Sequence, residues 1–370
     1  MPLSKGGGIQ VADALLQNLR AQSRIDWMAV VPNNASKLAL PKDPRYVTLP
    51  KRSPLDVLNS RFLLAEIEKR YRPDLVFTVF GPPYYRSSAP HLVGFALPRL
   101  IYPSAVPLSA IERAKDRVRS ALLRRADQFV VETEVVRQLL ATRLCVALHS
   151  IAVIGNSLNP TIASMTPQPL PATDSPKILV PAAYYPHKNL DFVPLVAASM
   201  ASLVPGIKFE FQLTLPASSP EWANIRRSAQ ALGVAEHVRT LGALSLDELS
   251  AAYVSCSLVF LPTLLEASTA VYPEAFHFRR PLVTSDLSFA KELCGPAAEY
   301  TSPRDPNAAA SSILRVLEPS PIRELLVERG IKQLANYPSP EQKFTLQVEL
   351  FESIVAGAHR QQQGPPDRAF

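Results

Sequence analysis

Hydrophobic residues occur along this chain in two recurring patterns. Short apolar runs, such as residues 73–81 (PDLVFTVFG) and 258–263 (LVFLPT), are typical of strands buried on both faces of a parallel sheet. Longer segments with apolar residues three and four positions apart, such as 9–19, are typical of helices with one buried face. Because the two kinds of segment alternate throughout, we expect an α/β fold with helices on both faces of parallel sheets.

The same patterns predict the remaining elements. Further strands are predicted at 27–31, 91–96, 128–133, 151–157, 177–182, 209–216, 238–242 and 281–285. Further helices are predicted near 63–67, 110–126, 193–203, 222–232, 246–253 and 271–278, with more helices towards the end of the chain. Residues 156–176 interrupt the alternation with five prolines and no long apolar run, which is typical of a linker.

We therefore expect two Rossmann-like domains that face each other across a cleft. They cover residues 1–155 and 177–357, and residues 156–176 join them. The last helix of the second domain can pack back on the first, and residues 358–370 are expected to be a disordered tail. In open parallel sheets, ligands bind beyond the carboxyl ends of the strands, so the loops that follow strands are the places to look for chemistry.

The start of the chain predicts an incomplete first domain. Only five residues precede the glycine run Gly6–Gly8, and they are too few and too polar for a buried central strand. We expect this strand to be missing, which would leave its neighbours with unpaired backbone groups. The alternative is that another segment takes its place or that the sheet does without it.

The amino-acid composition limits the classes of protein to which this chain can belong. The chain has 370 residues, of which 47% are hydrophobic and 19% charged, enough for two buried cores. No apolar run is long enough to span a bilayer, and the three cysteines lie far apart, as expected of reduced thiols in a cytoplasmic protein. The net charge of +7 indicates an anionic partner, which could be a nucleotide, a phospholipid surface or nucleic acid.

The loop at residues 182–189 (AAYYPHKN) carries the first candidate. It follows the predicted strand 177–182, and Lys188 stands before the next helix. A cation beyond a strand end can meet a phosphate group. The alternative is an ordinary surface lysine.

The second candidate unit is the strand, turn and helix at residues 258–278. Glu266 follows the strand, and three small residues, Ser268, Thr269 and Ala270, lead into the helix. Small residues and free N–H groups suit a diphosphate, whereas Ser268 or Thr269 could equally cap the helix. An ionised carboxylate at Glu274 can accept two hydrogen bonds from a ribose diol, although two ordinary surface carboxylates would also fit this spacing.

These segments resemble glycosyltransferase family 4, retaining enzymes of the GT-B fold. The matching residues are Glu266 and Glu274 followed by residues 281–286 (PLVTSD), together with residues 294–306. The PHKN loop at 186–189 and residues 90–103 are similar to one bacterial branch of that family. The resemblance implies that Glu274 holds the ribose of the donor, Glu266 meets its sugar and Lys188 meets its diphosphate. Residues Ser268, Thr269, Ala270 and Gly8 are assigned to the same donor site.

The implied reaction moves a sugar from a nucleotide-diphosphate donor to a hydroxyl of a glycan or lipid-linked glycan, with retention. It needs no metal and no cofactor beyond the nucleotide-sugar co-substrate, and the sequence has no D-x-D, P-loop or H-E-x-x-H motif. Two alternatives stay open, a sugar-nucleotide epimerase and a non-catalytic binding protein of the same fold. A nucleic-acid binder is disfavoured because no recognition module is visible.

Two features depart from the family pattern. Residues 182–184 (AAY) replace a second phosphate-binding arginine, and no histidine follows the strand at 91–96. His91 stands at the start of that strand and is interpreted as structural, so the acceptor-side catalytic group stays open. Gly81, Tyr84 and Tyr85 follow a strand end and are better placed to line a cleft.

The predicted helix at 110–126 is strongly basic. Its cations are Arg113, Lys115, Arg117, Arg119, Arg124 and Arg125, and its apolar residues include Ile111, Val118, Leu122 and Leu123. We interpret it as a helix with its apolar stripe in the core and its charges in water. The alternative is peripheral contact with an anionic membrane at the cytoplasmic face.

Overall fold

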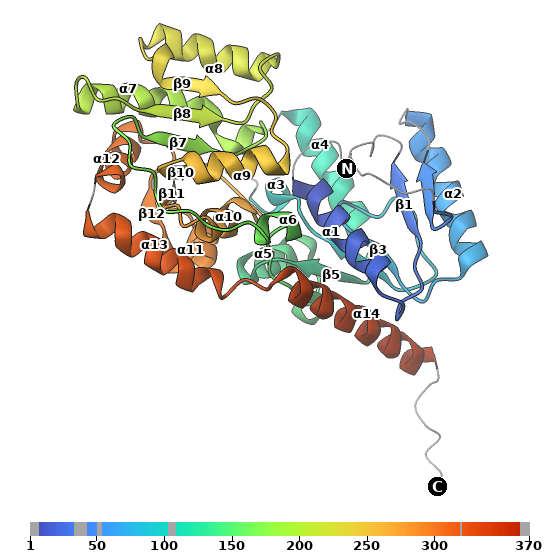
Figure 1. Ribbon diagram of the computed structural model, residues 1–370. Coiled ribbons are helices and arrows are strands. Elements are labelled where there is room, and N and C mark those ends of the chain that lie inside the picture. Colours follow the sequence, from blue (N-terminus) through green and yellow to red (C-terminus); the bar gives the residue numbers. More distant parts are fainter. Residues whose placement is uncertain (1–6, 33–42, 50–53, 103–108, 319, 363–370) are drawn as a thin grey trace. The chain divides into compact units, whose positions relative to one another are not determined.

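The computed structural model describes residues 7–32, 43–49, 54–102, 109–318 and 320–362. The chain forms two compact units (Figure 1), and each is described by itself. Unit 1 comprises residues 1–101, 107–155 and 339–370, and unit 2 comprises residues 102–106 and 156–338. The second unit therefore ends before residue 357, because the last helix of the chain belongs to unit 1.

Unit 2 is built on one parallel sheet of six strands. They are β7 (Lys177–Val180), β8 (Glu210–Leu213), β9 (Val238–Thr240), β10 (Leu258–Leu261), β11 (Leu282–Ser285) and β12 (Glu299–Thr301). Their order across the sheet is β12-β11-β10-β7-β8-β9, and every neighbouring pair is parallel. The chain thus winds outwards in one direction from β7 and then in the other from β10. This is the doubly wound order, and its reversal point lies between β7 and β10.

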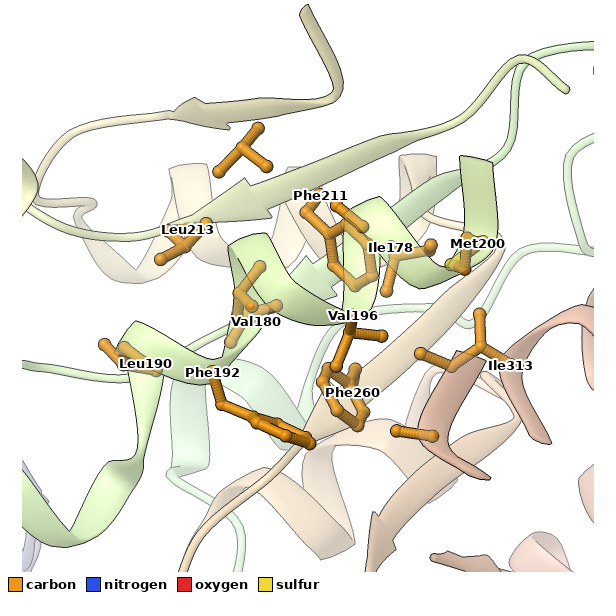
Figure 2. Packing of buried hydrophobic residues seen from close by; sticks show 14 of the residues in the cluster. Ile178, Val180, Leu190, Phe192, Val196, Met200, Phe211, Leu213, Phe260 and Ile313 are labelled. Carbon is orange, nitrogen blue, oxygen red and sulfur yellow. The ribbon is translucent and has the colours of Figure 1, made fainter. Parts of the chain in front are cut away.

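Helices cover both faces of this sheet. They are α6 (Pro160–Ala163), α7 (Val193–Leu203), α8 (Pro220–Ala231), α9 (Leu246–Ser255), α10 (Val271–His277), α11 (Ser288–Cys294), α12 (Pro306–Leu317) and α13 (Pro321–Leu334). Side chains alternate between the faces along each strand. Ile178 and Val180 of β7 pack with Val196 of α7 and Ile313 of α12 (Figure 2), whereas Leu179 packs in the cluster on the other face.

Local signals explain where several of these helices begin and end. The hydroxyl of Ser245 accepts from the backbone of Glu248, and the Glu248 carboxylate accepts from the backbone of Ser245, which is a capping box for α9. Gly233 follows α8 with a φ of 71°, a conformation that glycine adopts without a steric penalty. The predicted helix 193–203 is found with the same bounds.

Residues 156–176 are not a free linker. They belong to unit 2, where α6 forms within them and Ile162 is fully buried. The buried guanidinium of Arg280 donates from Nη2 to the carbonyl of Gln168 at 3.0 Å and from Nη1 to that of Pro169 at 3.2 Å. The proline-rich composition therefore marks a segment with little regular structure beyond α6, which hydrogen bonds to its carbonyls help to hold on unit 2.

Unit 1 has two separate parallel sheets within the part of the chain that the structure describes. One pairs β1 (Ala29–Pro32) with β2 (Tyr46–Leu49), and the other has the order β3 (Val76–Thr78), β4 (His91–Gly94), β5 (Gln128–Val131) and β6 (Ile151–Val153). Its helices are α1 (Gly7–Ala21), α2 (Pro54–Tyr71), α3 (Pro98–Ile101), α4 (Ala110–Leu123), α5 (Glu134–Leu144) and α14 (Pro340–Gln362). The prediction of a missing first strand concerns residues 1–6, which lie outside the described residues.

The apolar run at 73–81 forms a much shorter strand than predicted, because the chain leaves β3 after Thr78. The departing backbone crosses close to β4, and a Cβ atom at Gly94 would lie 1.9 Å from the carbonyl oxygen of Val79. Gly81 then turns the chain with a φ of 105°. The glycine at position 94 is therefore required by a close backbone approach.

Other predictions differ from the structure at short elements and at the end of the chain. Strands β2 and β12 and helix α5 had no prediction. The two strands are short and lack a long apolar run, so they give little periodic signal. Helix α14 continues to Gln362, so the first residues of the predicted tail are helical, and residues 363–370 lie outside the described residues.

Candidate active site

Asn189 joins three loops at the carboxyl edge of the sheet in unit 2. It follows a short 3-10 turn (Pro186–Lys188) and adopts a left-handed backbone with a φ of 57°, which asparagine tolerates better than most residues. Its side-chain amide donates to the carbonyl of Pro262 at 3.1 Å and to that of Pro303 at 2.9 Å. The loops after β7, β10 and β12 are therefore held side by side.

The loop after β7 is also bound directly to the loop after β10. The backbone N–H of Leu264 donates to the carbonyl of His187 at 2.7 Å, and the hydroxyl oxygen of Thr263 lies 3.0 Å from the same carbonyl oxygen. These contacts leave little freedom for the backbone on either side of Lys188.

Lys188 and Glu266 meet at this junction. The Lys188 Nζ lies 2.5 Å from Glu266 Oε1, and the hydroxyl of Thr263 donates to the same oxygen at 2.9 Å. Both side chains are largely withdrawn from water, with relative exposures of 14% for Lys188 and 5% for Glu266. Both residues follow the strands that flank the reversal point of the sheet, the position where doubly wound folds bind ligands.

Glu274 lies in the first turn of α10 with only 3% of its surface exposed. The hydroxyl of Tyr253 on α9 donates to Glu274 Oε2 at 2.8 Å. Burial raises the pKa of Glu274 to about 7, and the hydrogen bond from Tyr253 opposes this rise. A carboxyl group with this pKa changes its charge near neutral pH, so its ability to accept hydrogen bonds is sensitive to pH.

The small residues before α10 lie between the two glutamates in sequence. Thr269 Oγ1 accepts from the backbone N–H of Val271 at 3.3 Å, so Thr269 satisfies one N–H at the helix start. The hydroxyl of Ser268 is buried and has no hydrogen-bond partner in the described part of the chain. A buried hydroxyl without a partner is costly, and a ligand oxygen at this turn would satisfy it.

The candidates in unit 1 have different surroundings. Gly8 lies in the first turn of α1, and its position relative to Lys188 is not defined because it belongs to the other unit. His91 is the first residue of β4, is 2% exposed, and its Nε2 lies 2.8 Å from the Thr78 hydroxyl. Burial lowers the pKa of His91. These contacts agree with the interpretation of His91 as a structural residue.

Sequence reasoning missed three residues that support the site, namely Asn189, Thr263 and Tyr253. A signal existed for Asn189, since asparagine directly after a turn is typical of a left-handed residue that joins loops. The contact of Tyr253 with Glu274 spans two helices, and no local pattern predicts it.

Within the described residues, no group of three or more His, Cys, Asp or Glu side chains could hold a metal ion. No described helix is both long enough and apolar enough to cross a bilayer.

The two units of parallel sheet and helix match glycosyltransferase structures of the GT-B fold, which confirms the predicted α/β fold class with parallel sheets. Residues 163–333, which contain Lys188, Glu266 and Glu274, match the family model for glycosyl transferases group 1. No curated protein sequence matches the chain.

Solved structures resemble the chain over most of its length. A glycosyltransferase from Rickettsia africae ESF-5 matches with a TM-score of 0.66 and 16% identity over 94% of each chain. Sucrose-phosphate synthase from Thermosynechococcus elongatus matches with a TM-score of 0.70 and 16% identity over 86% of each chain. Anabaena HepE, in complex with UDP and glucose, matches with a TM-score of 0.68 and 14% identity over 95% of this chain and 98% of its own. At these identities the likeness concerns the fold.

Proposed function

We propose that this protein is a glycosyltransferase that moves a sugar from a nucleotide-diphosphate donor to a hydroxyl of a glycan or lipid-linked glycan, with retention and without a metal ion. The observation that carries the proposal is the Lys188–Glu266 pair beyond the strands at the reversal point. The group 1 family match includes both residues. The complex of Anabaena HepE with UDP and glucose supports a nucleoside diphosphate and a hexose as ligand chemistry.

In this proposal Lys188 stabilises the diphosphate that leaves the sugar. An ammonium group has three N–H donors, so Lys188 can keep its bond to Glu266 and still donate to a phosphate oxygen. The buried hydroxyl of Ser268 supplies a further donor to the same group, and Thr269 and Ala270 bring the start of α10 close to it. Fixed donors in a site with little water stabilise developing negative charge more strongly than water does.

The two glutamates accept hydrogen bonds from the hydroxyls of the donor. Glu266 would bind the transferred sugar, held in place by Lys188 and Thr263. Glu274 would bind the ribose diol in its ionised form, with Tyr253 orienting its carboxylate. We assign no acceptor-side catalytic group, because the His91 ring is hydrogen-bonded to the Thr78 hydroxyl within unit 1.

The test is turnover by the purified full chain with UDP-, GDP- and ADP-sugars, in the presence and absence of glycan and lipid-linked acceptors. The proposal predicts acceptor-dependent release of the nucleoside diphosphate, a product with the anomeric configuration of the donor by NMR, and activity in excess EDTA. The same assay compares the Lys188→Ala variant with Lys291→Ala as a matched control, because the ammonium group of Lys291 forms an exposed ion pair with Asp286. Turnover of the donor without any acceptor would indicate an epimerase instead, and donor binding without turnover would indicate a binding protein.

A further inference from the structure

Helix α4 in unit 1 has an exposed apolar ridge. Ile111 is 68% exposed and Val118 is 60% exposed, although both were expected to pack in the core. The residues that α4 buries are Asp116, Ser120 and Leu123 instead. Ile111, Ala114, Val118 and Ala121 are three or four positions apart and all exposed, so they form one stripe along the helix.

The burial of Asp116 explains this orientation. Its carboxylate accepts from Arg119 at 2.6 Å and from Arg99 at 3.0 Å, and the Ser120 hydroxyl donates to the Asp116 carbonyl at 2.9 Å. Arg99 precedes α4 in sequence and comes from α3, so this ion-pair network fixes the polar side of α4 against unit 1. The ridge with Ile111 and Val118 is thereby turned to the solvent.

Cations flank the ridge. Arg117 of α4, Arg124 at the C-terminal cap of α4 and Arg143 of α5 line a cavity of about 160 Å³ together with Ser120. Among the described residues, no ion pair joins a carboxylate to these three arginines, and the guanidinium of Arg124 donates to the carbonyl of Leu144. Their charges are therefore uncompensated. Arg125 follows the ridge at its end and is also exposed.

We propose that α4 is a membrane-surface helix that lies on an anionic bilayer, with Ile111 and Val118 inserted among the lipid chains and the arginine cavity bound to lipid phosphate groups. The pattern of an apolar ridge bordered by arginines is that of helices that lie in the plane of a membrane interface. Segment 110–126 carries six cations and two acids, and both acids are paired within unit 1, so its charge complements anionic headgroups.

A bilayer fits this surface better than nucleic acid does. Phosphate contacts with nucleic acid would use the arginines but leave Ile111 and Val118 in water or against polar groups. No aromatic side chain lies on α4 to stack with a base. Insertion of the ridge into a bilayer removes the same apolar surface from water.

The experiment is cosedimentation of the full chain with phosphatidylcholine vesicles that contain 0 or about 30% phosphatidylglycerol. We expect binding only to the anionic vesicles, weakened by added salt. Arg117→Gln, Arg124→Gln and Arg143→Gln together should lower the partition constant by about a hundredfold, since each cation near an anionic surface contributes about fivefold. Ile111→Asp with Val118→Asp should lower it by at least tenfold.

Matched controls come from the exposed surface of unit 2. Leu203→Asp and Arg226→Gln change exposed residues of α7 and α8 and should leave vesicle binding unchanged. A second measurement uses tryptophan variants, so it does not depend on whether the protein folds with aspartate in the ridge. Val118→Trp should give blue-shifted emission that brominated lipids quench, whereas Leu203→Trp should not. Equal binding to neutral vesicles, binding that survives the arginine and ridge substitutions, or binding to RNA or DNA in place of vesicles would each overturn the proposal.

Discussion

Lys188 Nζ lies 2.5 Å from Glu266 Oε1, although 78 positions separate the two residues in the chain. The pair is reinforced by the hydroxyl of Thr263, which donates to the same carboxylate oxygen. Lys188 can bind a further anion only if it also keeps its ion pair with Glu266, because the Glu266 carboxylate is buried and needs a counter-charge.

Substitution Lys188→Ala should weaken binding of a nucleoside diphosphate by roughly 10- to 100-fold, the effect of losing a charged hydrogen bond of about 1.5–3 kcal/mol. It should hardly change binding of the bare nucleoside, which has no phosphate. Calorimetric titration of both ligands measures the difference. The exposed Lys291→Ala variant should bind both ligands as the unsubstituted protein does. Equal losses for both ligands in a folded Lys188→Ala protein would contradict a role at the diphosphate.

Glu274 should make stability depend on pH. Its pKa is about 7 in the folded protein and 4.5 in the reference state, so the folded protein binds the proton more tightly. The contribution of Glu274 to the free energy of unfolding is therefore fully present below pH 4.5 and is lost as the pH rises to about 7 and above. The loss amounts to roughly 3 kcal/mol.

Urea denaturation of the unsubstituted protein and of Glu274→Gln at several pH values tests this, because other groups cancel in the difference. The unsubstituted protein should lose stability relative to the variant between pH 4.5 and 7. Tyr253→Phe should extend the loss to higher pH, since Tyr253 holds the pKa of Glu274 down. A difference that stays constant over this range would show that Glu274 does not titrate there.

Arg280→Ala should destabilise unit 2 by about 3 kcal/mol, because the carbonyls of Gln168 and Pro169 would lose their donor and the buried Arg280 side chain would leave a cavity. The stability of Arg280→Lys should lie between that of Arg280→Ala and that of the unsubstituted protein. Lysine keeps the positive charge but lacks the forked geometry of the guanidinium group. Thermal unfolding measures both variants. Arg226→Ala on the exposed side of α8 should stay within about 0.5 kcal/mol of the unsubstituted protein. An Arg280→Ala protein as stable as this control would mean that residues 156–176 are not held by Arg280.

Gly94→Ala and Gly357→Ala should have opposite effects. The new methyl group at position 94 would lie 1.9 Å from the Val79 carbonyl oxygen, so we expect a loss of about 3 kcal/mol or more, seen as a lower melting temperature or insoluble protein. Gly357 lies inside α14, and a Cβ there meets nothing within 4 Å. Alanine should stabilise that helix by roughly 0.5–1 kcal/mol. Two variants of equal stability would argue against the close approach at Gly94.

The sequence by itself determined the α/β class, most of the strands and helices, and the loops in which Lys188 and Glu266 stand. These features depend on local periodicity and on turns, which a few neighbouring residues specify. The same reasoning could not predict that Tyr253 on α9 would donate to Glu274 on α10, because that contact depends on how two helices pack on one sheet. It also could not show that residues 156–176 pack on Arg280, since composition reports the lack of regular structure and not the lack of contacts.

Only the tertiary structure decided which face of α4 is buried. Hydrophobic periodicity favours Ile111 and Val118 as core residues, yet Asp116 and Ser120 occupy the buried side. The reason is that Arg99, which lies on another helix, supplies the charge that lets the Asp116 carboxylate leave water. Periodicity measures the preference of a side chain for water, whereas the orientation of a helix depends on which partners the rest of the fold brings to each of its faces.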